Sequence, residues 1–219
     1  MKNRILTGII LIALPLIYLA LVYSNMPDMV NVNYNLQGKS EGLVPKTEII
    51  VLIGALSGIT LIVLLTIGFI HRLTPKLSEP ANRHRMQNIA LAVTAFLVFV
   101  QCWLVYTFQQ GLNHASIKFI LAALSLLFAI IGNYMPNLKP NYVAGYRIPW
   151  TLNNEDNWRK THELAGKLWF FGGLLIMIMC ILLPFEIASV IFGICLLIML
   201  VLPAIYSYKL HKKMGTFVL

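Results

Sequence analysis

The sequence predicts an all-α membrane protein, a six-helix transmembrane bundle with a small extracytoplasmic β-hairpin loop. Of its 219 residues, 58% are hydrophobic and only 11% are charged, whereas soluble proteins average about 45–50% apolar and about 25% charged residues. Six apolar stretches are each long enough to cross about 30 Å of hydrocarbon. The basic residues are divided unevenly between the connecting segments. This composition excludes an ordinary soluble enzyme, a disordered regulator and a disulfide-built secreted domain.

The six expected spans contain about 20 residues each, which is the length needed to cross a bilayer as a helix. They are residues 5–23, 49–70, 88–108, 115–134, 164–183 and 187–207. The first apolar run is longer than the roughly 7–15 residues of a signal-peptide core, so it is interpreted as an uncleaved anchor. Pro15 and Pro203 are expected to kink the first and last spans. Each cysteine falls within a span, so no disulfide is expected.

The net charge of +9 is a signal of topology. A nucleic-acid binder gathers its basic residues on one soluble face, but these lie in short segments between spans. With the N-terminus inside, the outer segments hold only Lys39 and Lys46. The inner segments hold thirteen basic residues: Lys2, Arg4, Arg72, Lys76, Arg83, Arg85, Lys139, Arg147, Arg159, Lys160, Lys209, Lys212 and Lys213. This asymmetry places both termini in the cytoplasm, and no direct nucleic-acid contact is expected.

Two units are expected: residues 1–87, with two spans and an outer hairpin loop at 24–48, and residues 88–219, with four spans around a cytoplasmic motif loop at 135–163. In the outer loop, Val30, Val32 and Tyr34 alternate with asparagines, which is typical of a strand, and residues 43–44 can return after a turn. A lone hairpin is marginally stable, so it must lean on the bundle. It either caps the bundle or binds a ligand. The candidate ligand residues are Asp28, Val32, Tyr34, Gly38, Gly42 and Lys46.

The predicted spans contain almost no central ionisable residue, which disfavours proton-coupled transport. Gln101 is the most central polar side chain and is interpreted as an interhelical hydrogen-bonding residue. Gly54 and Gly58 form a G-x-x-x-G pattern that indicates close helix packing. A transporter or channel would instead need its polar side chains to converge in the bundle: Ser57, Thr94, Gln101 and Ser125.

The inner loop is rich in residues that break regular structure. Pro136, Pro140 and Pro149 exclude a helix in it, and Gly132 and Gly145 permit tight turns. After the loop, an asparagine at position 153 or 154 can cap an amphipathic helix that leads into the fifth span, with acidic residues in its first turn.

Aromatic residues follow the loop at helical spacing. Trp158, His162, Ala165 and Trp169 share one face of the expected helix, and Trp150 and Trp158 are expected near the membrane interface. An aromatic belt with a rigid connector explains the tryptophans. It does not explain so much proline, glycine and asparagine in one connector, or Arg147 between two aromatic residues.

Three motifs in this region together resemble the signature of the SdpI family. They are Gly132-x-x-Met135-Pro136-x-x-Lys139-Pro140-Asn141, Gly145-x-Arg147-x-Pro149-Trp150-Thr151-Leu152 and Trp158-x-x-Thr161-His162-x-x-x-Gly166. The outer loop, from Met26-Pro27-Asp28 to Pro45-Lys46, is similar to the short domain that often precedes this signature. The candidate functional residues that the resemblance indicates are Asn133, Met135, Pro136, Lys139, Pro140, Asn141, Gly145, Arg147, Pro149, Trp150, Thr151, Trp158, Thr161 and His162.

The resemblance implies a multi-pass bacterial plasma-membrane protein that protects its producer from a secreted, membrane-active toxin peptide. The implied partners are the lipid bilayer, that peptide and a small cytoplasmic repressor held at the membrane. It implies no catalytic residue, metal or cofactor. Two alternatives stay open: a small-molecule transporter or channel-like protein, and a membrane enzyme that uses the 132–166 motif. The polar residues for such an enzyme would be Asn141, Arg147, His162 and Glu163.

Overall fold

The structure is a computed structural model that describes residues 2–34, 40–69, 80–110, 114–141 and 144–215, with side chains described for 4–30, 42–69, 84–110, 118–141 and 144–213. The long helices are α1 (Lys2–Val22), α2 (Lys46–Phe69), α3 (Pro80–Gln110), α4 (His114–Tyr134), α6 (Glu155–Leu182) and α7 (Phe185–Gly215). The short elements are η1 (Tyr23–Asn25), β1 (Met29–Tyr34), β2 (Ser40–Pro45), η4 (Met135–Asn137) and α5 (Pro149–Leu152).

The six expected spans are confirmed, since six helices within the described residues are long and apolar enough to cross a membrane. Three helices extend well beyond the predicted spans: α3 begins at Pro80, α6 at Glu155, and α7 continues to Gly215. The apolar pattern marks only the part of a helix that crosses hydrocarbon, whereas polar turns continue each helix outside it. The division into units 1–87 and 88–219 stays a prediction, and α3 runs continuously across residues 87 and 88.

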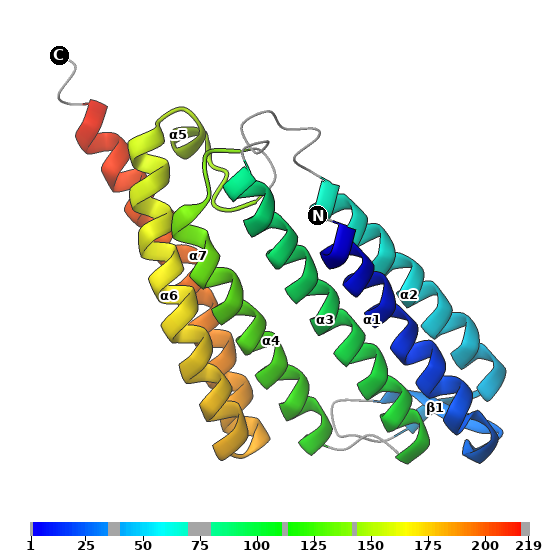
Figure 1. Cartoon of the computed structure of the whole chain (residues 1–219). Coiled ribbons are helices and arrows are strands. Elements are labelled where there is room, and N and C mark those ends of the chain that lie inside the picture. The colour runs from blue at the N-terminus through cyan, green and yellow to red at the C-terminus, as the bar shows by residue number, and fades with distance from the viewer. Residues whose placement is uncertain (1, 35–39, 70–79, 111–113, 142–143, 216–219) are drawn as a thin grey trace.

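The helices form a bundle in which α1 packs on α2 and α3, and α4 packs on α6 and α7 (Figure 1). Helices α3 and α4 lie next to each other at the centre and join the two groups. The hairpin lies at one end, whereas the N-terminus, α5 and the C-terminus lie at the other. Large apolar side chains face outward along the helices; Leu21, Val51 and Leu182 are each 72% exposed. Apolar exposure on this scale is the surface of a protein that contacts lipid.

The backbones of α4 and α6 approach closely along a line of glycines. A Cβ on Gly132 would lie 2.5 Å from the backbone nitrogen of Phe170, and one on Gly173 would lie 2.6 Å from the carbonyl oxygen of Ser125. Gly132 therefore serves helix packing within α4, and the expected role in a tight turn is wrong. In a bilayer, where lipid tails are as apolar as leucine, such close van der Waals packing holds helices together.

The central polar residues make separate contacts. Gln101 of α3 accepts a hydrogen bond from Ser57 Oγ and donates one to Thr60 Oγ1, each at 2.8 Å, so its interhelical role is confirmed. Ser125 donates instead to the carbonyl of Leu121 in its own helix. Thr94 Oγ1 is buried without a hydrogen-bond partner. These contacts do not form the continuous polar path that a transporter would need.

The G-x-x-x-G pattern of α2 does not pack against the part of this chain that the structure describes. A Cβ on Gly54 or Gly58 would meet no atom within 4 Å, so the expectation of close packing is wrong. The buried face of α2 is the one that carries Ile53, Ser57 and Thr60, and the two glycines lie on its exposed side. Spacing alone could not show which face of an apolar helix meets a neighbour.

The predicted hairpin is confirmed as an antiparallel pair in which Val30 lies opposite Val44. Val30 is 2% exposed and joins a core cluster with Ile49, Ile53 and Val105, which belong to α2 and α3. The hairpin thus covers the end of the bundle formed by α1, α2 and α3, and this contact gives a two-stranded sheet the support that it lacks alone.

The glycine line predicts a contrast between two substitutions to alanine. Gly173→Ala is expected to lower the free energy of unfolding by about 1–3 kcal/mol, because the new methyl overlaps the backbone of α4. Gly54→Ala should leave stability unchanged or raise it by up to about 1 kcal/mol, since the site is open and alanine favours a helix. Unfolding of both variants in detergent micelles measures the difference, and equal stabilities would contradict the packing.

Candidate functional site

The connector between α4 and α6 folds into ordered short elements. Pro136 lies at the start of the 3₁₀ turn η4, and Pro149 begins the short helix α5. The expectation that these prolines exclude a helix is therefore wrong for α5, because proline is well tolerated at a first helical position, where no N–H donor is needed. Thr151 secures α5: its hydroxyl accepts from the backbone N–H of Ile148 and donates to the carbonyl of Tyr146, at 3.2 and 2.6 Å.

Trp158 fastens the connector to α6. It is 1% exposed, and its Nε1–H donates to the carbonyl of Leu138 at 2.7 Å. Its ring stacks on His162 with 4.0 Å between centroids. Trp158 is therefore buried within the protein, and its expected place near the membrane interface stays a prediction. Pro136 is pressed equally close to α6, because a Cβ on Gly166 would lie 2.5 Å from Pro136 Cγ.

His162 holds the second half of the connector. It is fully buried; its Nε2 accepts from the backbone N–H of Tyr146 at 3.1 Å, and its Nδ1 lies 2.8 Å from the carbonyl of Trp158. These contacts fit a neutral ring with the proton on Nδ1, and they occupy both nitrogens. Gly145 has φ +103°, and a Cβ there would overlap His162 Nε2. Only glycine suits this turn.

Tyr146 reaches from the connector to a carbonyl inside α7. Its hydroxyl donates to the carbonyl of Met199, which also accepts from Trp169 Nε1 of α6 at 3.1 Å. That carbonyl is free because the residue four positions later is Pro203, which has no N–H to donate. Burial raises the pKa of the Tyr146 phenol, so it remains protonated and donates at neutral pH. Pro203 therefore creates the acceptor that the connector uses.

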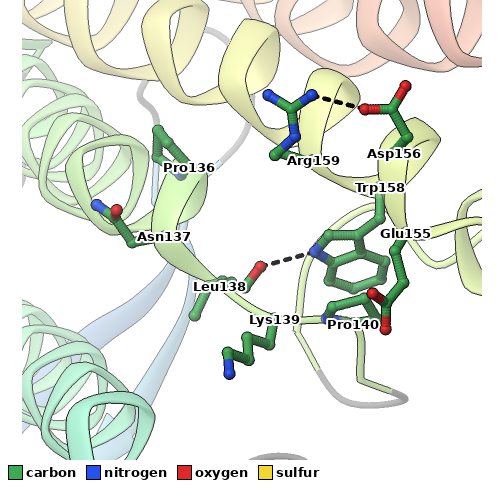
Figure 2. A pocket seen from close by; sticks show the side chains of 9 residues that line it. All are labelled: Pro136, Asn137, Leu138, Lys139, Pro140, Glu155, Asp156, Trp158 and Arg159. Carbon is green, nitrogen blue, oxygen red and sulfur yellow. Dashed lines mark hydrogen bonds and ion pairs between the residues drawn. The ribbon is translucent and has the colours of Figure 1, made fainter.

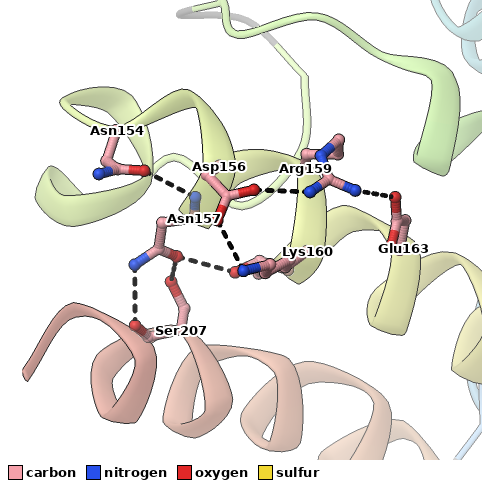
Figure 3. A network of polar contacts seen from close by, with 8 residues as sticks. Asn154, Asp156, Asn157, Arg159, Lys160, Glu163 and Ser207 are labelled. Carbon is pink, nitrogen blue, oxygen red and sulfur yellow. Dashed lines mark hydrogen bonds and ion pairs between the residues drawn. The ribbon is translucent and has the colours of Figure 1, made fainter. Parts of the chain in front are cut away.

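A buried polar network joins α6 to α7 (Figure 3). Asn157 donates from Nδ2 to the carbonyl of Ser207 at 3.0 Å and accepts from the Ser207 hydroxyl at 2.6 Å. Thr161 also donates to Asn157 Oδ1. The predicted helix cap is confirmed at Asn154, whose side chain accepts from the backbone N–H of Asn157 at 2.8 Å. All polar atoms of the Asn157 side chain are thus paired, as burial requires.

Beside this network, α6 carries four charged residues that pair with one another (Figure 3). Asp156 lies 2.6 Å from both Arg159 and Lys160, and Arg159 also lies 3.0 Å from Glu163. Spacings of three and four residues bring these side chains together on one helix face. They form a chain of ion pairs at the start of α6.

A cleft of about 440 Å³ opens between residues 136–140 of the connector and the first turns of α6 (Figure 2). Four residues of α6 complete its lining: Glu155, Asp156, Trp158 and Arg159. On the far side, Arg85 of α3 donates to the carbonyl of Asn137 at 2.7 Å and so ties the connector to α3. The cleft is lined by the first and third motifs and by acidic residues that the motifs did not include.

The remaining motif residues lie outside the cleft. Asn141 is buried and shapes the turn by accepting from the backbone N–H of Ala144 and donating to the carbonyl of Lys139. Arg147 is exposed. Trp150 stacks on His211 of α7 with 5.9 Å between centroids. The residues needed for an enzyme, Asn141, Arg147, His162 and Glu163, do not line this cleft. Asn133 is exposed near the end of α4, and Met135 is buried.

The outer candidate residues are only partly brought together. Asp28 lies 2.9 Å from Lys46, whose ammonium also lies 5.2 Å from the centre of the Tyr23 ring. The hydrogen bond from Lys46 lowers the pKa of the Asp28 carboxyl. Gly42 lies in β2. Val32 and Tyr34 lie in β1, although their side chains are outside the description, and Gly38 is outside the described residues.

Sequence reasoning did not single out Tyr146 or Asn157, and it placed Trp169 on a helix face without naming its contact. These three residues make the contacts between the connector, α6 and α7. One signal for Tyr146 was available: a proline inside a helix leaves a carbonyl free four residues earlier, and a buried donor must satisfy it. Nothing in the sequence indicated which donor.

Comparison with known proteins agrees with the motifs. The SdpI/YfhL protein family matches residues 137–207, which begin in the connector and end in α7. The immunity protein SdpI of Bacillus subtilis (strain 168) is 26% identical over 218 residues, covering 98% of this chain and 99% of the relative. No solved structure matches. The predicted resemblance is therefore confirmed.

The free carbonyl of Met199 predicts a coupling between two distant positions. Tyr146→Phe is expected to lower the free energy of unfolding by about 1 kcal/mol, because it removes the hydroxyl that donates to the carbonyl of Met199 and accepts from Trp169 Nε1 at 3.2 Å. In a Pro203→Ala background the restored N–H donates to Met199, so the same change should cost less than about half as much. A double-mutant cycle in detergent micelles measures this coupling, and equal costs in both backgrounds would count against it.

The turn at Gly145 predicts how the connector can be opened. Gly145→Ala should cost roughly 1–3 kcal/mol of backbone strain and displace His162. We expect faster tryptic cleavage after Arg147 with unchanged helix content. The matched control is Gly193→Ala in α7, where a Cβ meets no atom within 4 Å. If both variants are digested at the wild-type rate, the turn does not depend on glycine.

Proposed function

Residues 137–207 match the SdpI/YfhL family, and on this premise we propose that the chain is a membrane immunity protein that protects its cell from a secreted, membrane-active peptide. One observation carries the proposal: similarity to a protein named an immunity protein extends over 98% of this chain. That similarity includes both the outer hairpin and the motif connector, so it is more than a shared helical composition. We propose a bacterial plasma membrane as its location, with both termini cytoplasmic. The excess of basic residues at the end of the bundle that carries the connector and both termini supports this orientation.

In this proposal the toxin peptide engages the hairpin end. The hairpin lies on the core of the bundle through Val30, which packs against Val105 of α3. It therefore offers a surface that is continuous with a helix crossing the membrane. At the opposite end of α3, Arg85 bonds the connector at Asn137. A change at the hairpin has a short physical route to the motif through α3, provided that the bundle has two discrete arrangements.

A second part of the proposal concerns the cytoplasmic end. We infer that the connector and α5 present a surface to a small cytoplasmic repressor once toxin is bound outside. The exposed Arg147 and the stack of Trp150 on His211 support this inference, because Arg and Trp are frequent anchors of protein interfaces. Protection and repressor binding have separate readouts, survival and recruitment of the repressor to the membrane, and both are expected to depend on this surface.

Survival of a toxin-sensitive host tests the immunity function. Expression of the wild-type chain is expected to raise survival on exposure to an SdpC-type peptide. Arg147→Ala and Trp150→Ala should each reduce survivors by about tenfold, the effect of losing one interface anchor. Lys209→Ala, which removes an exposed charge of α7 at the same end, is the matched control.

Protein levels in the membrane must be equal for all variants, and immunoblotting of membranes checks them. If the wild-type chain gives no protection against any related peptide, the immunity function is wrong for this protein. If it protects and both variants protect equally well, the connector is not part of the protective mechanism.

A further inference from the structure

We propose that the cleft between the connector and α6 binds the headgroup of a phospholipid that carries both a phosphate and a primary ammonium, as phosphatidylethanolamine does. This site is independent of toxin immunity. At about 440 Å³, the cleft falls within the roughly 300–1,000 Å³ typical of small-molecule sites.

The charges that line the cleft favour a zwitterionic ligand. Two cations, Lys139 and Arg159, are balanced by two carboxylates, Glu155 and Asp156. A purely anionic or purely cationic ligand would meet both an attractive and a repulsive partner. A ligand with both charges can place its phosphate beside one cation and its ammonium beside the carboxylate at the same end.

Part of this arrangement is present before a ligand binds. Figure 2 shows Arg159 and Asp156 together at one end of the cleft, and Lys139 and Glu155 at the other, with Trp158 between them. Arg159 is held by Asp156 at 2.6 Å and by Glu163 at 3.0 Å. Trp158 joins the two walls through its bond to Leu138. Such pre-organisation reduces the entropy cost of binding.

The position of the cleft along the membrane normal indicates the source of its ligand. Helix α6 has 28 residues, about 42 Å at 1.5 Å per residue, whereas the hydrocarbon core is about 30 Å thick. The C-terminal end of α6 is apolar and exposed at Ile178, Ile181 and Leu182. The turns of α6 that extend beyond the hydrocarbon core are therefore the charged ones that begin at Glu155. They lie at the depth of lipid headgroups, which are the most concentrated zwitterions there.

Native mass spectrometry of the purified full chain tests the proposal. The protein is offered equal amounts of dioleoyl phosphatidylethanolamine, phosphatidylcholine and phosphatidylglycerol. We expect the wild type to retain phosphatidylethanolamine about tenfold better than the other two, the effect of one charge-assisted hydrogen bond. Glu155→Gln should remove this preference, because the amide cannot pair with an ammonium. Lys139→Gln should weaken both phosphatidylethanolamine and phosphatidylglycerol.

Two matched variants control for charge alone: Lys209→Gln at the same end and Glu48→Gln at the hairpin end, both exposed. Glu155 lies on an exposed first turn, so Glu155→Gln should fold, and an unchanged melting temperature verifies this. Equal retention of the three lipids by the wild type, or an unchanged preference in Glu155→Gln, would overturn the proposal. Binding of soluble phosphoethanolamine as tightly as the lipid would overturn the membrane source.

Discussion

The close contact between the backbones of α4 and α6 determines the form of the motif end. Where Gly132 and Gly173 allow the two helices to touch, the chain between them must turn back over a very small separation. The connector therefore lies directly on the first turns of α6. Pro136 rests on Gly166, and Trp158 bonds Leu138. If bulkier residues held the helices further apart, these contacts would be out of reach, and the cleft would lose one of its walls.

Helix α7 takes part through one interrupted helical hydrogen bond and one polar residue. Pro203 leaves the carbonyl of Met199 without its helical donor, and Tyr146 supplies one from the connector. Ser207 pairs with Asn157 through both its hydroxyl and its carbonyl. The connector thus contacts three helices at once, and its position reports the arrangement of all three. This property suits a segment that must respond to an event elsewhere in the bundle.

The sequence predicted features with a regular pattern and features at the ends of helices. Apolar runs predicted the membrane spans, and the alternation of apolar and polar residues predicted the hairpin. Asn154 marked the start of α6, because a helix cap depends only on neighbouring residues. The contacts inside the site were harder to predict from the sequence. The spacing of Trp158 is compatible both with a residue of an interfacial aromatic belt and with a buried hydrogen-bond donor. In sequence, Gly54 and Gly173 are both glycines in apolar helices, and only the structure shows that Gly173 packs against another helix. These outcomes depend on which face meets another helix, and periodicity in a uniformly apolar segment does not contain that information.

Three hydrogen bonds between the connector and the helices around it share one feature. Trp158, Tyr146 and Arg85 donate from their side chains, but the acceptors at Leu138, Met199 and Asn137 are main-chain carbonyls. A main-chain carbonyl is present whatever side chain its residue carries. These bonds alone do not specify the acceptor side chains, but Leu138 and Met199 are buried, so packing still constrains their size. Each donor position permits only side chains with an N–H or O–H at the right reach. Asn137 is exposed, and it is therefore the acceptor position whose side chain is least constrained.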